Sequence, residues 1–176
     1  YNGGGVGVGD FNGDGRPDLF FSGNQVANRL YLNTGDMTFR DVTAQAGITH
    51  RAWSTGVSVV DINADGRLDV YVCTINPKRG APGAPNLLYV NQGNDAEGVP
   101  RFREMAADYG LNDTGYSTQA AFFDYDRDGD LDCYLLTNGL EVYNRNQPRG
   151  PVRDGTGKST DRLYRNMTME RRNDSA

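Results

Sequence analysis

The sequence predicts an all-β fold made of repeated four-stranded units, and three observations support this prediction. An Asp-rich motif of nine residues occurs three times, at residues 10–18, 61–69 and 124–132. Each copy leads directly into a short run of apolar, strand-forming residues. The 176 residues include 23 glycines, and Asn, Asp and Thr are also frequent. This composition suits short strands that are joined by many tight turns.

The first unit contains four predicted strands. Residues 5–9 alternate glycine and valine and lead into the first motif, and residues 19–22 form the strand that leaves it. Residues 28–33 and 38–43 are the third and fourth strands, with a Thr-Gly-Asp turn between them. One helical turn is expected at residues 44–48. Four short antiparallel strands of this kind form one small sheet.

The second and third units repeat the order with insertions. The predicted strands of the second unit are residues 56–60, 70–73, 86–91 and 101–105, and those of the third unit are residues 118–123, 133–136 and 161–166. A fourth strand is missing from the third unit, because residues 167–176 are polar and carry no turn signal. We expect a truncated or divergent end there.

The spacing of the motifs predicts β-propeller blades. The distance is 51 residues from Asp10 to Asp61 and 63 residues from Asp61 to Asp124, which suits repeats of four strands each. The predicted units are blade 1 at 1–48, blade 2 at 49–111, a partial blade 3 at 112–166 and a tail at 167–176. Closed propellers have about four to eight blades. Three blades therefore predict part of a larger propeller, or one that other copies complete.

Each motif has the spacing of a loop wrapped around a hard cation. Oxygen-bearing side chains occupy positions 1, 3, 5 and 9, a glycine at position 6 allows a left-handed turn, and the main-chain carbonyl of position 7 can add a ligand. Six to eight oxygen ligands suit Ca²⁺ better than the rigid octahedron of Mg²⁺. We expect about three Ca²⁺ ions, one per loop. The candidate ligands are Asp10, Asn12, Asp14, Arg16, Asp18, Asp61, Asn63, Asp65, Arg67, Asp69, Asp124, Asp126, Asp128, Asp130 and Asp132.

Three other kinds of loop are less compatible with this pattern. An ordinary Asp-rich and Gly-rich turn without metal would not recur three times in register. An EF-hand needs a bidentate Glu at position 12, where this chain has Phe21, Val72 and Leu135. A dockerin continues into a helix, whereas each loop here continues into a strand. We expect a structural role for the ions, with the loops anchored by the apolar residues at positions 2 and 8: Phe11, Pro17, Ile62, Leu68, Tyr125 and Leu131.

The acidic charge follows from these loops. Ten of the 23 acidic residues are candidate ligands through their side chains, and three divalent ions would change the formal net charge from −5 to +1. No basic stripe with interleaved aromatic residues occurs, so nucleic acid is not an expected partner. No apolar run is long enough to span a membrane. Because Asp126 gives the third loop one carboxylate more than the other two, we expect that loop to bind Ca²⁺ most tightly.

The motif Asp-Phe-Asn-Gly-Asp-Gly-Arg-Pro-Asp-Leu, followed by Arg-Leu-Tyr-Leu-Asn, resembles the FG-GAP and VCBS repeat families. Such calcium-loop blades are found in integrin α-chain propellers, and the sequence also resembles bacterial and animal proteins like cartilage acidic protein, which often carry an ASPIC/UnbV module. The likeness covers residues 3–166. It implies a closed propeller, commonly of seven blades, with calcium between the first two strands of each blade. It also implies an extracellular role in interaction.

Insertions in the second and third units indicate a ligand-binding face. The connection between second and third strands becomes longer with each unit: it is residues 24–27 in the first, 74–85 in the second and 137–160 in the third. All three connections are expected at the end opposite the cation loops. A protein or glycan ligand is expected at this face. Aromatic and arginine residues that could contact it are Trp53, Arg51, Arg79, Tyr116 and Arg149.

Several other features carry less functional information. Residues 155–160 are similar to a phosphate-binding loop but lack its first glycine, since Val152 stands there. His50 is the single histidine and has no nucleophile pattern beside it, so no enzyme is expected. Cys73 and Cys133 fall on opposite faces of equivalent strands, which predicts two buried free thiols and no disulfide. Glycosylation sequons begin at Asn112, Asn166 and Asn173.

Three hypotheses of function follow. The first is an extracellular, cell-surface or periplasmic calcium-binding module for adhesion or for protein or glycan interaction. The second is a lectin, or the propeller part of a polysaccharide enzyme. The third is a structural subunit that assembles into rings or filaments through unpaired blade edges.

Overall fold

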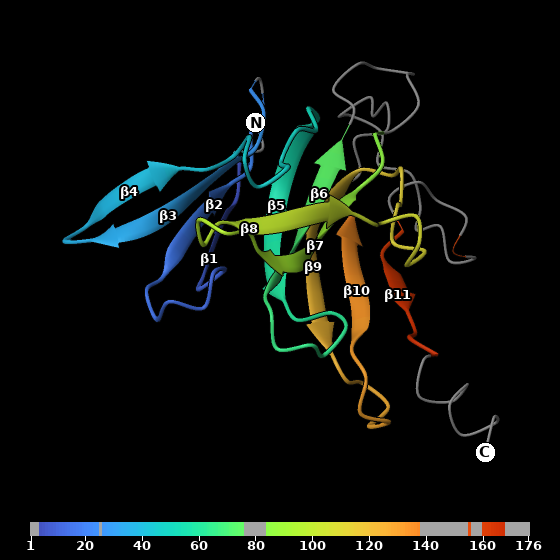
Figure 1. The fold of residues 1–176 in the computed structure, drawn as a ribbon. Helices are drawn as coiled ribbons and strands as arrows, with labels where there is room; N and C mark the ends of the chain where they lie inside the picture. Colours follow the sequence, from blue (N-terminus) through green and yellow to red (C-terminus); the bar gives the residue numbers. More distant parts are fainter. Residues whose placement is uncertain (1–3, 25, 76–83, 138–154, 156–159, 168–176) are drawn as a thin grey trace.

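The computed structural model describes residues 4–24, 26–75, 84–137, 155 and 160–167. These residues form three antiparallel sheets in which the strands follow chain order (Figure 1). The first sheet contains β1 (Val6–Gly9), β2 (Asp18–Phe21), β3 (Arg29–Gly35) and β4 (Thr38–Asp41), the second contains β5 (Trp53–Val60), β6 (Asp69–Ile75), β7 (Leu87–Asn94) and β8 (Pro100–Glu104), and the third contains β9 (Ser117–Phe123), β10 (Asp132–Thr137) and β11 (Arg162–Tyr164). The described residues contain no helix long and apolar enough to cross a membrane.

The predicted strands are confirmed, and each sheet is one propeller blade. The turn predicted at residues 44–48 is closed by hydrogen bonds from Ala46 N to Val42 O at 2.7 Å and from Ile48 N to Thr43 O at 3.0 Å. The described part of the third sheet has three strands. Most of the tail, residues 168–176, lies outside the described residues, and the exact limits of the blades stay a prediction.

The blades pack face to face through two buried clusters. Phe20, Leu30 and Leu32 of the first sheet meet Val57, Val70, Val72 and Tyr89 of the second sheet in one cluster. Tyr71, Leu88 and Val90 of the second sheet meet Ala120, Cys133 and Leu135 of the third sheet in the other. The second sheet thus packs one side-chain layer against the first sheet and the alternate layer against the third, because successive side chains of a strand point to opposite faces.

This packing refines the prediction for the two cysteines. Both are buried free thiols, as expected. Their opposite faces do not separate them, however, because the forward face of one blade meets the backward face of the next, and both belong to the second cluster. Burial raises the pKa of both thiols, that of Cys133 to about 12.

Small residues on the innermost strands set how closely the blades approach. A Cβ atom added at Gly7 would lie 2.8 Å from Cγ2 of Val59 and 2.9 Å from Cγ1 of Val57. At the junction between the second and third blades the larger and smaller residues are reversed: Ser58 stands at the position of Gly7, and Ala120 at the position of Val57. The Ser58 hydroxyl donates to the Ala120 carbonyl at 2.5 Å. The larger Ser58 is thus matched by the smaller Ala120 at this junction, while Phe122 stands at the position of Val59.

Buried amides connect successive blades at the end opposite the cation loops. Asn28 accepts hydrogen bonds from Gly23 N and from the Ser54 hydroxyl of the next blade, both at 2.9 Å. Asn86 repeats the contact by donating to the Ser117 hydroxyl at 2.9 Å. Because buried polar groups are costly without partners, these pairs favour one relative position of the blades.

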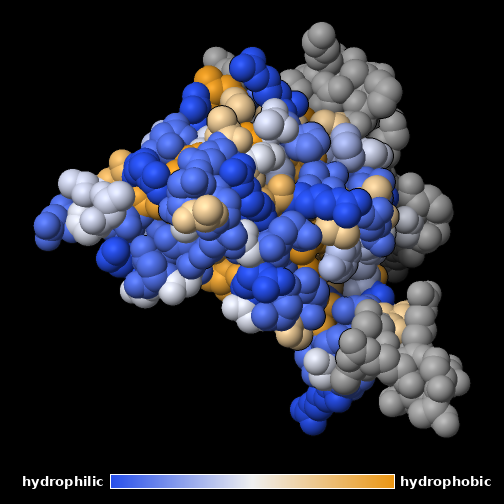
Figure 2. Space-filling view, viewed as in Figure 1, coloured by the Kyte–Doolittle hydropathy of each residue, from blue (hydrophilic) through white to orange (hydrophobic). Residues whose placement is uncertain are grey.

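The outward faces of the first and third blades are exposed in this structure. Tyr134 and Leu163 of the third blade are 39% and 50% exposed, whereas the equivalent residues of the second blade, Tyr71 and Leu88, are fully buried. The side of the molecule seen in Figure 2 is largely hydrophilic.

Candidate metal centres

All three cation loops share one backbone conformation. The glycine at position 6 has a positive φ in each loop: 83° at Gly15, 83° at Gly66 and 94° at Gly129. Position 4 is left-handed as well, and only the first loop has a glycine there. In the other two loops Ala64 has a φ of 55° and Arg127 a φ of 64°. This conformation is strained for residues with a side chain.

The carboxylate at position 1 closes each loop. In the first loop, Asp10 Oδ1 accepts a hydrogen bond from Asp14 N at 3.0 Å and Asp10 Oδ2 accepts one from Gly15 N at 2.7 Å. Asp61 and Asp124 make the same pair of contacts in the second and third loops. The backbone N–H groups thus hold these carboxylates on the inner side of the turn.

The carboxylate at position 9 connects the loop to the third strand of its blade. Asp69 is fully buried and accepts hydrogen bonds from Ile62 N at 2.9 Å and Asn91 N at 2.8 Å. Asp18 and Asp132 are buried in the same way and accept from Asn33 N and Asn166 N, respectively.

Burial acts on the ionisation of these carboxylates. It raises the pKa of Asp69 to about 6, although hydrogen bonds from Asn91 and Ile62 lower it, and the neighbouring Asp65 and Asp61 raise it further. Burial also raises the pKa of Asp18. A cation in the loop would favour the charged form of both groups.

The asparagine that pairs with position 9 also contacts the loop through its side chain. Asn33, Asn91 and Asn166 donate from Nδ2 to the position 8 carbonyls of Pro17, Leu68 and Leu131. In addition, Asn91 donates at 2.9 Å to the Phe11 carbonyl in the loop of the preceding blade. No role is predicted for these residues from the sequence, although an Asn recurs two residues after a Tyr in all three repeats.

The third loop brings three carboxylates close together. Oxygen atoms of Asp124, Asp126 and Asp128 lie within 4.8 Å of one another. Asp126 Oδ1 and Asp128 Oδ2 are buried, and neither has a hydrogen-bond donor among the described residues. Unpaired buried carboxylate oxygens are costly, so this donor set fits a divalent cation with oxygen ligands.

Position 7 distinguishes the first two loops from the third. The Arg67 guanidinium lies 2.5 Å from Asp65 Oδ2, and the Arg16 guanidinium lies 3.6 Å from Asp14 Oδ2. The backbone N–H of Arg16, more than any other contact, lowers the pKa of Asp14. The third loop has Asp130 at position 7. Its arginine comes instead from beyond β11, where Arg165 Nε lies 2.6 Å from Asp126 Oδ2.

The predicted anchors of the loops are only partly buried. Phe11 and Ile62 at position 2 are 3% and 8% exposed and belong to the clusters between blades. Tyr125 at the same position is 42% exposed, because its side of the third blade is open. Pro17 at position 8 is exposed as well.

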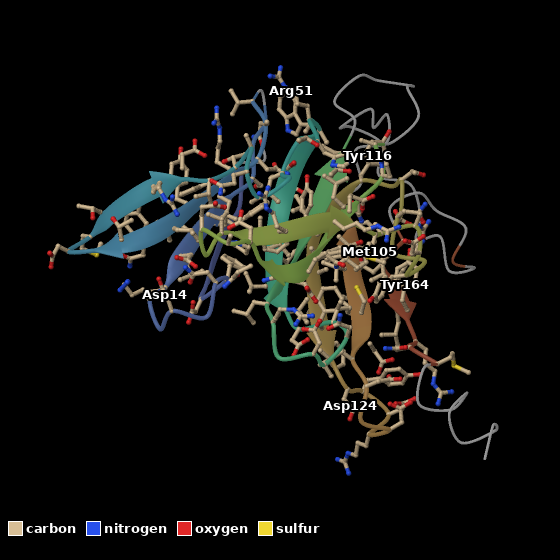
Figure 3. All side chains as sticks on the ribbon, viewed as in Figure 1. Asp14, Arg51, Met105, Tyr116, Asp124 and Tyr164 are labelled. Atoms are coloured by element: carbon tan, nitrogen blue, oxygen red, sulfur yellow. The ribbon has the colours of Figure 1, made fainter. Side chains whose placement is uncertain are left out.

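Residues predicted for a ligand face lie away from the cation loops. Figure 3 shows Arg51 and Tyr116 at one end of the sheets and Asp14 and Asp124 toward the other. Trp53 is at the same end as Arg51, since it pairs with Ile75 where β6 ends.

The remaining candidates have varied surroundings. His50 is exposed, and its ring centroid is 5.9 Å from that of Tyr89. Of the sequon asparagines, Asn112 is exposed and Asn166 is used in the third loop. Arg79, Arg149, Asn173 and most of residues 155–160 lie outside the described residues.

Comparison with known proteins places these loops in a family. A model of the FG-GAP-like repeat matches residues 10–72, which contain the first two loops. Cartilage acidic protein 1 from Homo sapiens is 33% identical over 109 residues, covering 61% of this chain and 15% of that protein. The Mus musculus protein is 31% identical over 144 residues, 80% of this chain and 20% of that protein. The Xenopus tropicalis protein is 28% identical over 137 residues, 77% and 20%, respectively.

This chain therefore spans 15–20% of the length of these relatives. The matched repeat, the three loops and the blade architecture agree with one another. The chain thus contains an FG-GAP-like repeat at residues 10–72 and is similar to cartilage acidic protein 1.

Proposed function

We propose that this chain is an extracellular calcium-binding repeat module that presents a ligand-binding face. The observation that carries the proposal is the convergence of Asp124, Asp126 and Asp128 with two buried carboxylate oxygens that have no donor among the described residues. The other two loops share the backbone conformation and the position 1 and position 9 contacts. Relationship to cartilage acidic protein 1 supports an extracellular setting.

The role proposed for calcium is structural. The ion would be held by oxygens at positions 1, 3 and 5 of each loop, with position 9 and the position 7 carbonyl as further candidates. It supplies positive charge to a group of carboxylates that otherwise repel one another. The residues of the chain then keep the loop attached to the blade, since the position 9 carboxylate accepts hydrogen bonds from both the loop and the third strand.

A thermal unfolding experiment tests this role. The melting temperature is measured in EDTA and in Ca²⁺ at about 100 times the dissociation constant, with Mg²⁺ as the comparison ion. Binding of one ion to the folded state at this concentration adds about 2.7 kcal/mol of stability. For a chain of this size this raises the melting temperature by roughly 5–10 °C. An unchanged melting temperature in EDTA and Ca²⁺ would contradict the proposal.

The ligand is proposed to be a protein or a glycan that binds at the end opposite the loops. A hollow of about 560 Å³ at the first blade is lined by residues that include Arg29, Asp41 and Arg51. Its charged and hydroxyl-bearing lining could form hydrogen bonds to either class. Screening against a glycan array and against immobilised extracellular proteins separates the two. Arg51→Ala should weaken the interaction, whereas Arg103→Ala on the exposed surface of β8 serves as the control.

A further inference from the structure

The three repeats allow each residue of the third cation site to be compared with its equivalents in the same chain. Position 3 of the loop is Asn12 in the first repeat, Asn63 in the second and Asp126 in the third. One residue before the asparagine that contacts the loop, the three repeats have Leu32, Val90 and Arg165. Besides Asp130 at position 7, the third repeat thus differs from the others at these two positions, one of which is acidic and the other basic.

These two substitutions meet in space. Arg165 Nε lies 2.6 Å from Asp126 Oδ2, and their side chains are 43% and 18% exposed. Leu32 and Val90 are only 3% and 2% exposed and pack in the clusters between blades. Arg165 stands on the open side of the third blade, where its charged group can reach the loop without being buried between sheets.

The pair involves one of the carboxylates that converge in the third loop. Asp126 Oδ1 is a buried oxygen without a hydrogen-bond donor among the described residues, while Asp126 Oδ2 is next to Arg165. A cation that binds Asp124, Asp126 and Asp128 would therefore lie close to a guanidinium group. The bound cation and the Arg165 guanidinium would repel each other, and both would be attracted to the Asp126 carboxylate.

We propose that Arg165 is a tethered counter-cation that lowers the calcium affinity of the third loop and stabilises the loop when calcium is absent. This inference rests on the proposed function, because it concerns the affinity of a site whose occupation is itself proposed. It predicts that the extra carboxylate of Asp126 does not make the third loop the tightest site until Arg165 is removed. Arg165, which follows β11, and Asp126 in the loop would then together set the calcium affinity of this site.

A luminescence titration can follow the third loop. Tyr125 occupies position 2 of this loop, where the other loops have Phe11 and Ile62, so its excitation should sensitise Tb³⁺ bound there. Burial raises the pKa of Tyr109, and the carboxylates of Asp69 and Asp65 raise it further, so Tyr109 is close to the second loop. All variants are therefore made in a Tyr109→Phe background, and Ca²⁺ is titrated against bound Tb³⁺.

Arg165→Leu introduces the residue found at Leu32. It should lower the dissociation constant for Ca²⁺ at the third loop by about three- to tenfold, because one nearby positive charge is removed. The same variant should melt at a lower temperature than the parent in EDTA. Asp126→Asn should raise the dissociation constant, and the double variant should fall between the two. Arg165→Gln is the second variant if Arg165→Leu impairs folding, and Arg103→Gln, which removes an exposed charge on β8, should change the constant by less than about twofold.

The outcomes distinguish this inference from the proposed function. Tb³⁺ emission in the parent together with an unchanged or raised dissociation constant in both Arg165 variants overturns the role of Arg165 and leaves the calcium site intact. Absence of Tb³⁺ emission in the parent, with a melting temperature that does not respond to Ca²⁺, overturns the proposed function and this inference with it.

Discussion

The close approach of the first two blades at Gly7 predicts that Gly7 and Val57 are energetically coupled, which a double-mutant cycle can measure. In the Gly7→Ser variant the new Cβ atom would lie 2.8 and 2.9 Å from methyl groups of Val59 and Val57, which are closer than ordinary contacts. Valine side chains have little rotational freedom, so the blades must shift. Overpacking of this kind costs about 1–3 kcal/mol. The melting temperature should fall by roughly 2–12 °C for a chain of this size.

The next blade junction shows how the cost can be relieved. Ser58 and Ala120 occupy there the positions of Gly7 and Val57. Val57→Ala alone removes two buried methyl groups and should cost about 1.6 kcal/mol for lost burial, plus a cavity contribution. In the double variant the serine fills the space that Val57 leaves, so its contact with Val57 is relieved, while its contact with Val59 remains. We expect the double variant to be at least about 1 kcal/mol more stable than the sum of the two single effects predicts.

Urea unfolding of the four proteins measures this interaction energy. Val8→Ala is the matched control, because Val8 is on the same strand but 56% exposed, and it should change the unfolding free energy by only about 0.5 kcal/mol. If the effects of Gly7→Ser and Val57→Ala add to within about 0.5 kcal/mol, the two residues are not coupled, and size matching between blades does not determine their spacing.

Three further predictions concern the loops and the buried polar groups. Ala64→Gly should raise the unfolding free energy by about 0.5–1 kcal/mol, because Ala64 has a φ of 55°, whereas Gly13→Ala, at a φ of 73°, should lower it; chemical denaturation measures both. Tyr71→Phe should lower the unfolding free energy by about 1–3 kcal/mol in the same assay. The buried Tyr71 hydroxyl donates to the Leu111 carbonyl at 2.8 Å, and the variant would lose this donor. Burial raises the pKa of Cys73 and Cys133, so above about pH 9 only the unfolded chain ionises these thiols. The unfolding free energy should therefore be unaffected by them below this pH and fall above it by about 1.4 kcal/mol per pH unit for each thiol. Cys73→Ala should halve the part of this slope that the two thiols cause. A slope unchanged by Cys73→Ala would show that this thiol is not the cause.

The local chemistry of the cation loops could be predicted from sequence, whereas their connections to the blades could not. Alternating oxygen ligands and the glycine at position 6 lie within nine residues, so one motif is enough to indicate them. The left-handed backbone at position 4 cannot be predicted from Ala64 and Arg127 themselves, because the closed loop imposes it on them. The part played by Asn91 depends on atoms that are 22 and 80 residues away in sequence.

The prediction for the cysteines shows the same limit in another form. The strand period places the two cysteines on opposite faces of equivalent strands, and both are buried and free. Only the face-to-face packing of successive blades brings Cys73 and Cys133 into one cluster. Alternation along a strand tells which residues share a face, but the stacking of sheets decides which faces meet.

The position of Asn91 links the loops of two blades into one cooperative unit. Its backbone N–H is held by Asp69 of the second loop, while its side chain binds the Phe11 carbonyl of the first. Asn94 adds a second contact from the second blade to the first loop, because its side-chain amide donates to the Asn12 carbonyl at 2.7 Å. Local unfolding of the first loop would therefore remove partners from β7, and the amide hydrogen exchange of the second blade becomes sensitive to events in the first. Protection against exchange is a property of neighbouring repeats together, even though each repeat has its own loop and its own sheet.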